Sequence, residues 1–443
     1  MMDYQEAWSY LDRLQFFKIK LGLASMARFL DSVGNPQQGL RCIHVAGTNG
    51  KGSVAAVLLA VLSRAGYRAG LYTSPHLSCV RERFRINDRY ISEDEFAREA
   101  SCIRQALGEE QITYFEFTTA LALLWFAREK VDVAILEVGM GGRLDATNVI
   151  TPLVGVITNV SMDHEQYLGN TLAAVAAEKA GIIKSGVPLV SGVAADESQD
   201  VVSRVCREQG APLYLLGRDF RAEAMAAGLF CYRGPGEKPR LLAGLRNGLA
   251  GRHQMENAAL ALAALDLAAG QLPVCEEDIR AGLGSVRWPG RLEFFCLAAG
   301  RVVECPEPGR EEGDLRRYLL DGAHNPAGVQ SLKAALQSDF PRKRLILVWA
   351  SMADKDFAGA LAIIADMADM IVFTRPESER SAGPEQLRLA LPVGKQPCVL
   401  AAATVAAALA EAARQARSAD LICVAGSLYL VGAARKILLG DLA

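Results

Sequence analysis

A glycine-rich segment containing one lysine lies between a predicted strand and a predicted helix. Residues 41–46 are a short apolar run, residues 47–53 read GTNGKGS, and an apolar helical pattern follows them. In this setting backbone N–H groups and a helix N-terminus hold phosphates, and Lys51 would reach the outer phosphates. The spacing departs from the common pattern G-x-x-x-x-G-K-S/T, because Val45 replaces the first glycine and Gly52 replaces the hydroxyl residue. The alternative is an ordinary glycine-rich turn.

A carboxylate and a second lysine are the next candidates for chemistry. Glu137 ends the apolar run VDVAILE, so its side chain is expected at the carboxyl edge of a parallel sheet, where ligands bind in open α/β folds. Magnesium prefers oxygen ligands, which makes Glu137 a candidate ligand. Lys179 lies on a predicted helix, and an unmodified ammonium facing magnesium would be repelled. A solvated helix lysine is the alternative interpretation of Lys179.

Alternating strands and helices must position these residues, and this alternation predicts parallel sheets covered by helices. Strands are predicted at 41–46, 131–137, 153–159, 187–191, 317–321, 344–350, 370–374 and 420–425. Helices are predicted at 53–65, 116–129, 171–184, 253–270 and 401–413, with a hairpin or small excursion at 218–250. The rhythm restarts after residues 287–291, which predicts a second, smaller α/β domain from residue 292.

Composition narrows the class of protein. The 443 residues are 51% hydrophobic and 22% charged, which is typical of a folded globular chain. The formal net charge of −2 gives no global field to attract nucleic acid or an anionic membrane. The 10 cysteines include no C-x-x-C pair and no Cys/His cluster at metal spacing, which disfavours zinc and indicates a reducing compartment. No leader or membrane span is recognisable, so a cytoplasmic protein is expected, and the lack of heptads predicts a monomer.

Short segments in a fixed order along nearly the whole chain carry a family resemblance. They are KLGL (20–23), GNPQ (34–37), HVAGTNGKGS (44–53), YTSPHL (72–77), FEFT (115–118), EVGMGGRLDATN (137–148), DH (163–164), KAGIIK (179–184), WPGR (288–291), DGAHNP (321–326) and GSLYL (426–430). Together they resemble the folylpolyglutamate synthase and dihydrofolate synthase family, relatives of the Mur ligases. One such segment is weak, whereas the ordered set is specific.

The resemblance implies an α/β fold with two domains. Residues 1–291 would form a P-loop-type, parallel-sheet domain that binds ATP and pterin, of the Mur ligase central type. Residues 292–443 would form a smaller Rossmann-like domain of the glutamate ligase C-terminal type. The implied reaction transfers the γ-phosphate of ATP to a carboxylate, and the amine of L-glutamate then attacks the acyl phosphate. Phosphoryl transfer between anions needs cations, a role that Lys51 and Mg²⁺ fit.

The family pattern also assigns site residues. The implied catalytic residues are Lys51, Lys179 and His324. The implied ATP contacts are Asn49, Gly50, Lys51, Gly52, Ser53, Asn257, Arg291 and Asp321, with ATP clamped where the two domains meet. The implied Mg²⁺ ligands are Ser74, Glu137 and His164. The family lysine that matches Lys179 is carbamylated, which turns a cation into an anionic oxygen donor and removes the conflict with the metal.

Three segments match those that line the dihydropteroate pocket in bifunctional members. Their residues are Leu21, Gly22, Leu23, Tyr114, Phe115, Glu116, Phe117, Leu144, Asp145 and Ala146. A pterin ring needs aromatic or apolar faces with a few polar groups, which Phe115 and Phe117 could supply. Both could equally be core residues, because aromatic positions on a helix are usually buried.

The resulting hypothesis is an ATP- and Mg²⁺-dependent amide ligase that joins L-glutamate to dihydropteroate and to reduced folates. The segment 143–148 resembles bifunctional bacterial members, which favours both activities. One alternative is a folylpolyglutamate synthase with a single activity. The other is a nucleotide-binding regulatory protein that does not ligate, but it leaves Glu137, His164, Lys179 and Asp321 unexplained together. The expected partners are small-molecule substrates, with no nucleic acid and no membrane.

Overall fold

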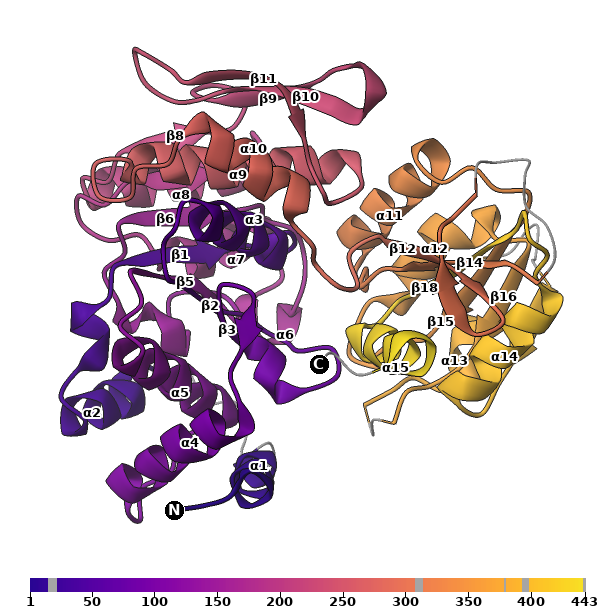
Figure 1. Ribbon diagram of the computed structural model, residues 1–443, viewed down its shortest axis with the longest axis horizontal. Helices are drawn as coiled ribbons and strands as arrows, with labels where there is room; N and C mark the ends of the chain where they lie inside the picture. Colours follow the sequence, from indigo (N-terminus) through magenta and orange to yellow (C-terminus); the bar gives the residue numbers. More distant parts are fainter. Residues whose placement is uncertain (15–21, 307–313, 378–379, 393–397, 441–443) are drawn as a thin grey trace. The chain divides into compact units, whose positions relative to one another are not determined.

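A computed structural model describes residues 1–14, 22–306, 314–377, 380–392 and 398–440 (Figure 1). The chain forms two compact units. Unit 1 comprises residues 1–76, 80–248 and 254–286, and unit 2 comprises residues 77–79, 249–253 and 287–443. Arg291, the last residue of the predicted first domain, lies in unit 2. Each unit has its own sheet and is described by itself.

The sheet of unit 1 has eight strands in the order β4-β3-β2-β5-β1-β6-β7-β8. The strands are β1 (Cys42–Ala46), β2 (Ala69–Tyr72), β3 (Phe84–Ile86), β4 (Arg89–Tyr90), β5 (Val133–Glu137), β6 (Val154–Ile157), β7 (Leu189–Ser191) and β8 (Leu213–Leu215). The strands β2, β5, β1, β6, β7 and β8 are neighbours in this order, and each of their pairs is parallel. The β2–β3 and β3–β4 pairs at the other end of the sheet are antiparallel. Strand β1 is fully buried, and its neighbours β5 and β6 run parallel to it in register. Both neighbours therefore end beside the glycine-rich loop that follows β1.

Helices cover both faces of this sheet (Figure 1). They are α1 (Tyr4–Arg13), α2 (Ala24–Ser32), α3 (Lys51–Arg64), α4 (Glu93–Leu107), α5 (Tyr114–Arg128), α6 (Glu165–Leu168), α7 (Leu172–Ala180), α8 (Glu197–Glu208), α9 (Arg252–Ala268) and α10 (Glu276–Ser285). Helix α3 packs on β1, β2 and β5, and α10 packs on α3. Cys42 and Tyr72 point to the other layer, where they share a core with residues of α1, α2, α4 and α5.

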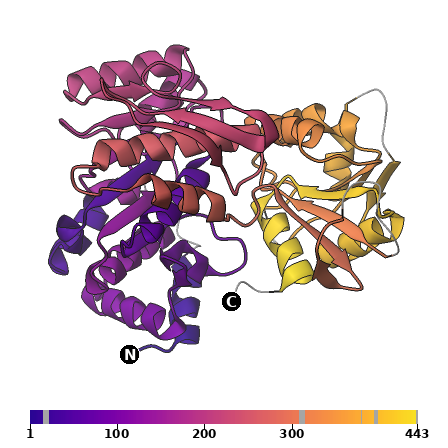
Figure 2. The same ribbon diagram turned by 45° about the horizontal axis from the view of Figure 1, so that its top comes forward.

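The segment predicted as a hairpin or excursion is a separate antiparallel sheet of three strands, in the order β11-β10-β9. The strands are β9 (Arg221–Ala224), β10 (Leu229–Arg233) and β11 (Leu241–Arg246), and β11 contacts α10 (Figure 2). Tyr232 of β10 donates a hydrogen bond of 2.7 Å to Asp266 of α9, which ties this sheet to the helices of unit 1.

The sheet of unit 2 has seven strands in the order β13-β12-β14-β18-β15-β16-β17, parallel from β14 to β17. The strands are β12 (Glu293–Ala298), β13 (Arg301–Val303), β14 (Arg316–Leu320), β15 (Leu345–Trp349), β16 (Met370–Phe373), β17 (Cys398–Ala401) and β18 (Leu421–Ala425). The helices are α11 (Pro326–Ser338), α12 (Phe357–Ile364), α13 (Pro384–Leu389), α14 (Val405–Gln415) and α15 (Leu428–Leu439). Two apolar cores, one on each face, hold this sheet between its helices.

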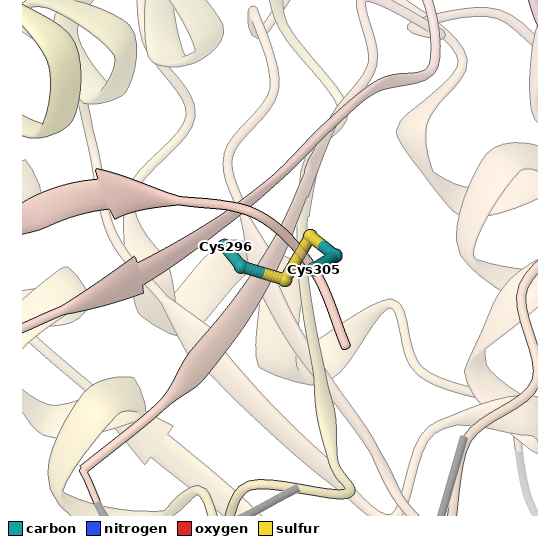
Figure 3. The surroundings of a disulfide bond; sticks show 2 residues. All are labelled: Cys296 and Cys305. Carbon is teal, nitrogen blue, oxygen red and sulfur yellow. A yellow bond between two sulfur atoms is a disulfide. The ribbon is translucent and has the colours of Figure 1, made fainter. Parts of the chain in front are cut away.

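A disulfide joins Cys296 of β12 to Cys305, which follows β13 (Figure 3). No motif in the sequence indicates this pair, and the reducing compartment expected from the sequence disfavours a disulfide. The hairpin explains the pairing, because Cys296 faces Val303 across the two strands and the Cα atoms of the two cysteines are 5.3 Å apart. The remaining eight cysteines are free thiols.

The predicted α/β class and the strand positions around the glycine-rich loop are confirmed. The structure adds the parallel strands β2, β8 and β17 and the antiparallel strands β3, β4, β12 and β13, which were not predicted. Helix α14 begins at Val405, later than expected, because Ala401 ends strand β17. In the described parts of the chain, no helix combines the length and apolar character that crossing a bilayer requires.

The contact between α3 and α10 makes a testable prediction about packing. A Cβ added to Gly282 of α10 would lie 2.6 Å from the Cα of Val61, so Gly282→Ala must push the two helices apart. We expect a loss of about 1–3 kcal/mol in the free energy of unfolding, measured by urea denaturation. Gly284→Ala on the same helix is the control, because its Cβ meets nothing within 4 Å. This control should be neutral or stabilising by about 0.5–1 kcal/mol, and equal losses in both variants would contradict the packing account.

Candidate active site

Two glycines of the loop between β1 and α3 lie in left-handed backbone and have no room for a side chain. Gly47 has φ 144°, and a Cβ there would lie 1.8 Å from Oγ1 of Thr158. Gly50 has φ 84°, and a Cβ there would lie 2.5 Å from Oδ1 of Asn257 on α9. The loop is therefore an enclosed structure that only glycine permits at these positions.

Residues that follow β6 fix the shape of the loop. Thr48 exchanges two hydrogen bonds with Ser161, each of 3.1 Å, through its hydroxyl. Asn159 accepts from the Asn49 N–H at 3.0 Å and donates to the Asn49 carbonyl at 3.1 Å. The hydroxyl of Thr158 donates to the same carbonyl at 2.6 Å. The loop is thus held in place by the neighbouring strand end before any ligand binds.

Lys51 and the first turn of α3 present positive charge inside this loop. The Lys51 ammonium donates to the carbonyls of Gly47 at 3.0 Å and Thr48 at 3.1 Å. Gly50 is the N-cap of α3 and has no side chain, so the first-turn N–H groups, including those of Gly52 and Ser53, receive no cap from it. Backbone N–H groups at a helix N-terminus beside a lysine form a suitable anion site.

Glu137 ends β5 beside this loop, since it is in register with Val45, two residues before Gly47. Glu137 is 5% exposed, and its carboxylate accepts a hydrogen bond of 3.3 Å from the backbone N–H of Ser74. A buried carboxylate and a hydroxyl residue suit Mg²⁺, which is bound by one or two carboxylates together with waters and phosphates. Glu137 and Ser74 are thus brought together and fit the predicted metal role.

His164, the third predicted metal ligand, is exposed and precedes α6 in left-handed backbone with φ 53°. Its N–H donates to the carboxylate of Asp163 at 2.9 Å. Within the described ranges, no group of three or more His, Cys, Asp or Glu side chains is arranged to hold a metal ion. The metal role of His164 therefore stays a prediction from the resemblance.

Lys179 lies on α7 and is only 3% exposed, so the alternative of a solvated lysine is wrong. Burial, followed by the charge of Lys51, lowers the pKa of its ammonium to about 7, against an opposing effect of Asp163. In a large fraction of the molecules, the amine of Lys179 is therefore neutral near neutral pH. Carbamate formation requires the neutral amine, because its lone pair attacks CO₂.

The predicted pterin residues are half-buried or buried where the structure describes them. Leu21 lies outside the described residues. Gly22 and Leu23 are half-buried where α2 begins, and Tyr114 and Phe115 are half-buried at the start of α5. Phe117 is fully buried in the core of unit 1, as the alternative interpretation predicted. Glu116 is buried, accepts a hydrogen bond from Ser25 and caps α5, so its visible role is to join α2 and α5.

Asp145 organises the loop between β5 and β6. One oxygen accepts from the N–H groups of Gly139 and Met140, both at 3.0 Å. The other accepts from Thr147, through the N–H at 3.0 Å and the hydroxyl at 2.5 Å. These four donors occupy the carboxylate oxygens that would otherwise accept hydrogen bonds from pterin N–H groups. Asp145 therefore acts as a positioning residue in this structure. Ala146 is 6% exposed within the core, and Leu144 is half-buried.

The predicted nucleotide residues of unit 2 gather at the end of β14. Asp321 is buried, and its carboxylate accepts from the N–H groups of Leu292 and Ala323, each at 2.9 Å. A Cβ added to Gly322 would lie 2.2 Å from Nη1 of Arg291, and His324 contacts the Gly322 carbonyl at 2.8 Å. Arg291, Asp321 and His324 are therefore brought together, as the sequence predicted.

Several residues of these sites were not singled out from the sequence. Thr158 and Asn159 brace the loop, and the polar pair directly after the buried strand β6 was the available signal. His44 of β1 contacts the Thr147 hydroxyl at 2.8 Å, and burial lowers its pKa to about 3, with Lys184 adding to the effect. The neutral imidazole therefore extends the network of Asp145 into the sheet.

Comparison with known protein families identifies two regions. Residues 45–265 match the Mur ligase middle domain, and residues 309–428 match the Mur ligase glutamate ligase domain. The dihydrofolate synthase/folylpolyglutamate synthase of Bacillus subtilis is 35% identical over 392 residues, which are 86% of each chain. The chain belongs to this family of Mur ligases. The family resemblance seen in the sequence is confirmed.

Further relatives and solved structures of the folylpolyglutamate and dihydrofolate synthase family agree. A probable bifunctional folylpolyglutamate synthase/dihydropteroate synthase of Haloferax volcanii is 36% identical over 98% of this chain, which spans 50% of that relative. Escherichia coli FolC in complex with DHPP and ADP superposes with a TM-score of 0.86 at 32% identity, covering 98% of this chain and 97% of that chain. A bifunctional enzyme with Mn, AMPPNP and L-glutamate bound gives 0.84 at 32% identity, covering 98% of each chain. The two-domain Mur ligase fold and the class of ATP- and metal-dependent ligase are therefore established for the family.

The buried amine of Lys179 is expected to form a carbamate with carbon dioxide. Because its pKa is lowered to about 7, the neutral fraction grows as the pH rises, and we expect carbamate loading to rise with it. Carbon-13 NMR of protein in labelled bicarbonate should show one carbamate signal that strengthens between about pH 6 and 8. The signal should be absent from Lys179→Ala and unchanged in Lys130→Ala, a control that removes an exposed lysine. A spectrum without a Lys179-dependent signal over this range would contradict the assignment.

Proposed function

We propose that this protein ligates L-glutamate to dihydropteroate and to reduced folates, with ATP as the phosphate donor and Mg²⁺ as the metal. The observation that carries the proposal is the placement of Lys51, the first turn of α3 and Glu137 at adjacent strand ends of one parallel sheet. Phosphoryl transfer is mainly a positioning and electrostatic task, and this edge supplies cationic donors for phosphate and a buried carboxylate for the metal.

The reaction proceeds in two steps. A substrate carboxylate oxygen attacks the γ-phosphorus of ATP, which releases ADP and forms an acyl phosphate. The glutamate amine, after loss of a proton from its ammonium, then attacks the carbonyl carbon, and phosphate leaves as the amide forms. Lys51 and the α3 N–H groups hold the transferring phosphate, while Ser74, Glu137 and His164 would hold Mg²⁺, which neutralises phosphate charge when bound. The carbamate of Lys179 would add an anionic oxygen donor beside the metal.

The remaining assignments are also part of the proposal. Asn257, whose Nδ2 donates to Gln254 at 3.0 Å, lies against Gly50 and contacts the nucleotide. Arg291 and Asp321 are the further proposed nucleotide contacts, and His324 is the further proposed catalytic residue. A cytoplasmic location and a monomeric state are proposed on the grounds given by the sequence.

Product analysis tests the function directly. Purified protein is incubated with ATP, Mg²⁺ and glutamate, together with dihydropteroate in one reaction and tetrahydrofolate in the other. We expect a glutamylated product in both, and phosphate release that requires both the pterin acid and glutamate. Lys51→Ala should lower the rate by about 100-fold or more at saturating ATP, because a charge-assisted contact to the transferring phosphate is lost. Glutamate-independent ATP turnover would favour the non-ligating alternative. A glutamylated product from only one of the two substrates would show that the enzyme has a single ligase activity.

The half-buried side chain of Leu144 offers a test of bifunctionality. The reacting carboxylate of dihydropteroate lies on the benzoyl ring, whereas that of a folate lies one glutamyl unit further out, so the two pterins cannot occupy the same position. If Leu144 borders the dihydropteroate position, Leu144→Ala should raise KM for dihydropteroate by about tenfold through lost apolar contact and leave KM for tetrahydrofolate unchanged. Arg143→Ala, which alters an exposed neighbour, is the control. Equal changes for both substrates would show that the segment is structural.

A further inference from the structure

Arg83 is a buried cation whose partners are all uncharged. It ends the short 3-10 helix Val80–Arg83, directly before β3, and is 7% exposed. Its Nε donates to Nδ1 of His76 at 2.9 Å, and its guanidinium lies 5.3 Å from the centre of the Tyr114 ring. Because arginine can only donate, this hydrogen bond makes Nδ1 of His76 the acceptor. The histidine and the tyrosine together fix the plane of the guanidinium.

Nη1 and Nη2 of Arg83 are the part of the group that the fold leaves unused. Among the residues that the structure describes, no carboxylate lies within 4.0 Å of Arg83, and neither Nη atom donates a hydrogen bond to one of them. Asp145 and Arg83 both influence the pKa of Tyr72, so this carboxylate lies in the same region as the guanidinium. Both oxygens of Asp145 already accept hydrogen bonds from its own loop. A buried arginine is normally paired, because burying an uncompensated charge is strongly unfavourable. The unused edge is therefore suited to an anion that the protein does not supply.

The surroundings of Arg83 identify the kind of anion. Tyr114 begins α5 and belongs to the segment matched to the pterin pocket. His76 lies two residues after Ser74, whose N–H contacts Glu137 at the phosphate-transfer edge. Arg83 thus bridges, through its two partners, the candidate pterin segment and the candidate metal segment. A ligand that enters both segments has a ring at one end and a carboxylate toward the other.

We propose that Nη1 and Nη2 of Arg83 bind a carboxylate of the pterin acid, so that Arg83 is a substrate-binding residue. This inference rests on the proposed function and names the contact that recognises the acidic end of its substrate. The planar fork of a guanidinium matches the two oxygens of a carboxylate, which a lysine ammonium does not. The contact orients the carboxylate for attack on the γ-phosphate of ATP.

The test compares three variants in steady-state kinetics with dihydropteroate, glutamate and ATP varied in turn. Arg83→Gln removes the charge, and Arg83→Lys keeps the charge without the fork. Arg85→Gln is the matched control, because Arg85 is half-buried on β3, stacks 5.2 Å from the Tyr90 ring and donates to the Asn87 carbonyl at 3.2 Å. Thermal melting of each variant reports whether it folds. If Arg83→Gln does not fold, the comparison uses Arg83→Lys instead.

We expect Arg83→Gln to raise KM for dihydropteroate by about 10- to 100-fold and Arg83→Lys by about tenfold, while KM for glutamate and ATP change less than about twofold. Arg85→Gln should match the wild type. In direct titrations, a pterin that lacks the carboxylate should bind the wild type and Arg83→Gln equally. An unchanged KM for dihydropteroate, or a rise confined to KM for glutamate, would overturn the inference. A wild-type protein that makes no glutamylated product would instead overturn the proposed function.

Discussion

The phosphate loop depends on two positions at which no side chain fits. Gly47 is closed off by Thr158 at the end of β6, and Gly50 is closed off by Asn257 on α9. These contacts bring β1, β6, α3 and α9 together around one loop, and the register of β1 with β5 adds Glu137 to the same edge. The parallel order of the central strands therefore assembles the site, because carboxyl ends of parallel strands meet at one edge of a sheet.

The buried charged side chains around this edge differ in the partners that hold them. Lys179 is held partly neutral by burial and by Lys51, Glu137 receives a backbone N–H, and Arg83 is held by a neutral histidine and an aromatic ring. Asp145 differs, since four donors from its own loop engage it. Arg83 keeps its two Nη atoms for a ligand, whereas the fully engaged carboxylate of Asp145 shapes the loop between β5 and β6.

The sequence was sufficient to predict the elements that carry the site, because glycines, Lys51 and Glu137 lie next to apolar runs of clear period. It was not sufficient to predict which polar residues would be engaged within the chain. The four donors to Asp145, the bracing by Asn159 and the partners of Arg83 all depend on loops that meet only in the folded chain. Phe117 likewise required the packing of α5 to place it in the core rather than in a pocket. The pairing of Cys296 with Cys305 followed from a hairpin that was not predicted.

Oxygen isotopes report whether the γ-phosphate is transferred directly to a substrate carboxylate. Dihydropteroate labelled with ¹⁸O in its carboxylate is converted with ATP, Mg²⁺ and glutamate, and the released phosphate is analysed by ³¹P NMR or mass spectrometry. If an acyl phosphate forms, one carboxylate oxygen remains bonded to phosphorus when the amine displaces it, so the phosphate carries one ¹⁸O atom. Product formation with unlabelled phosphate would show that ATP hydrolysis and amide formation are separate, and it would contradict an acyl phosphate intermediate.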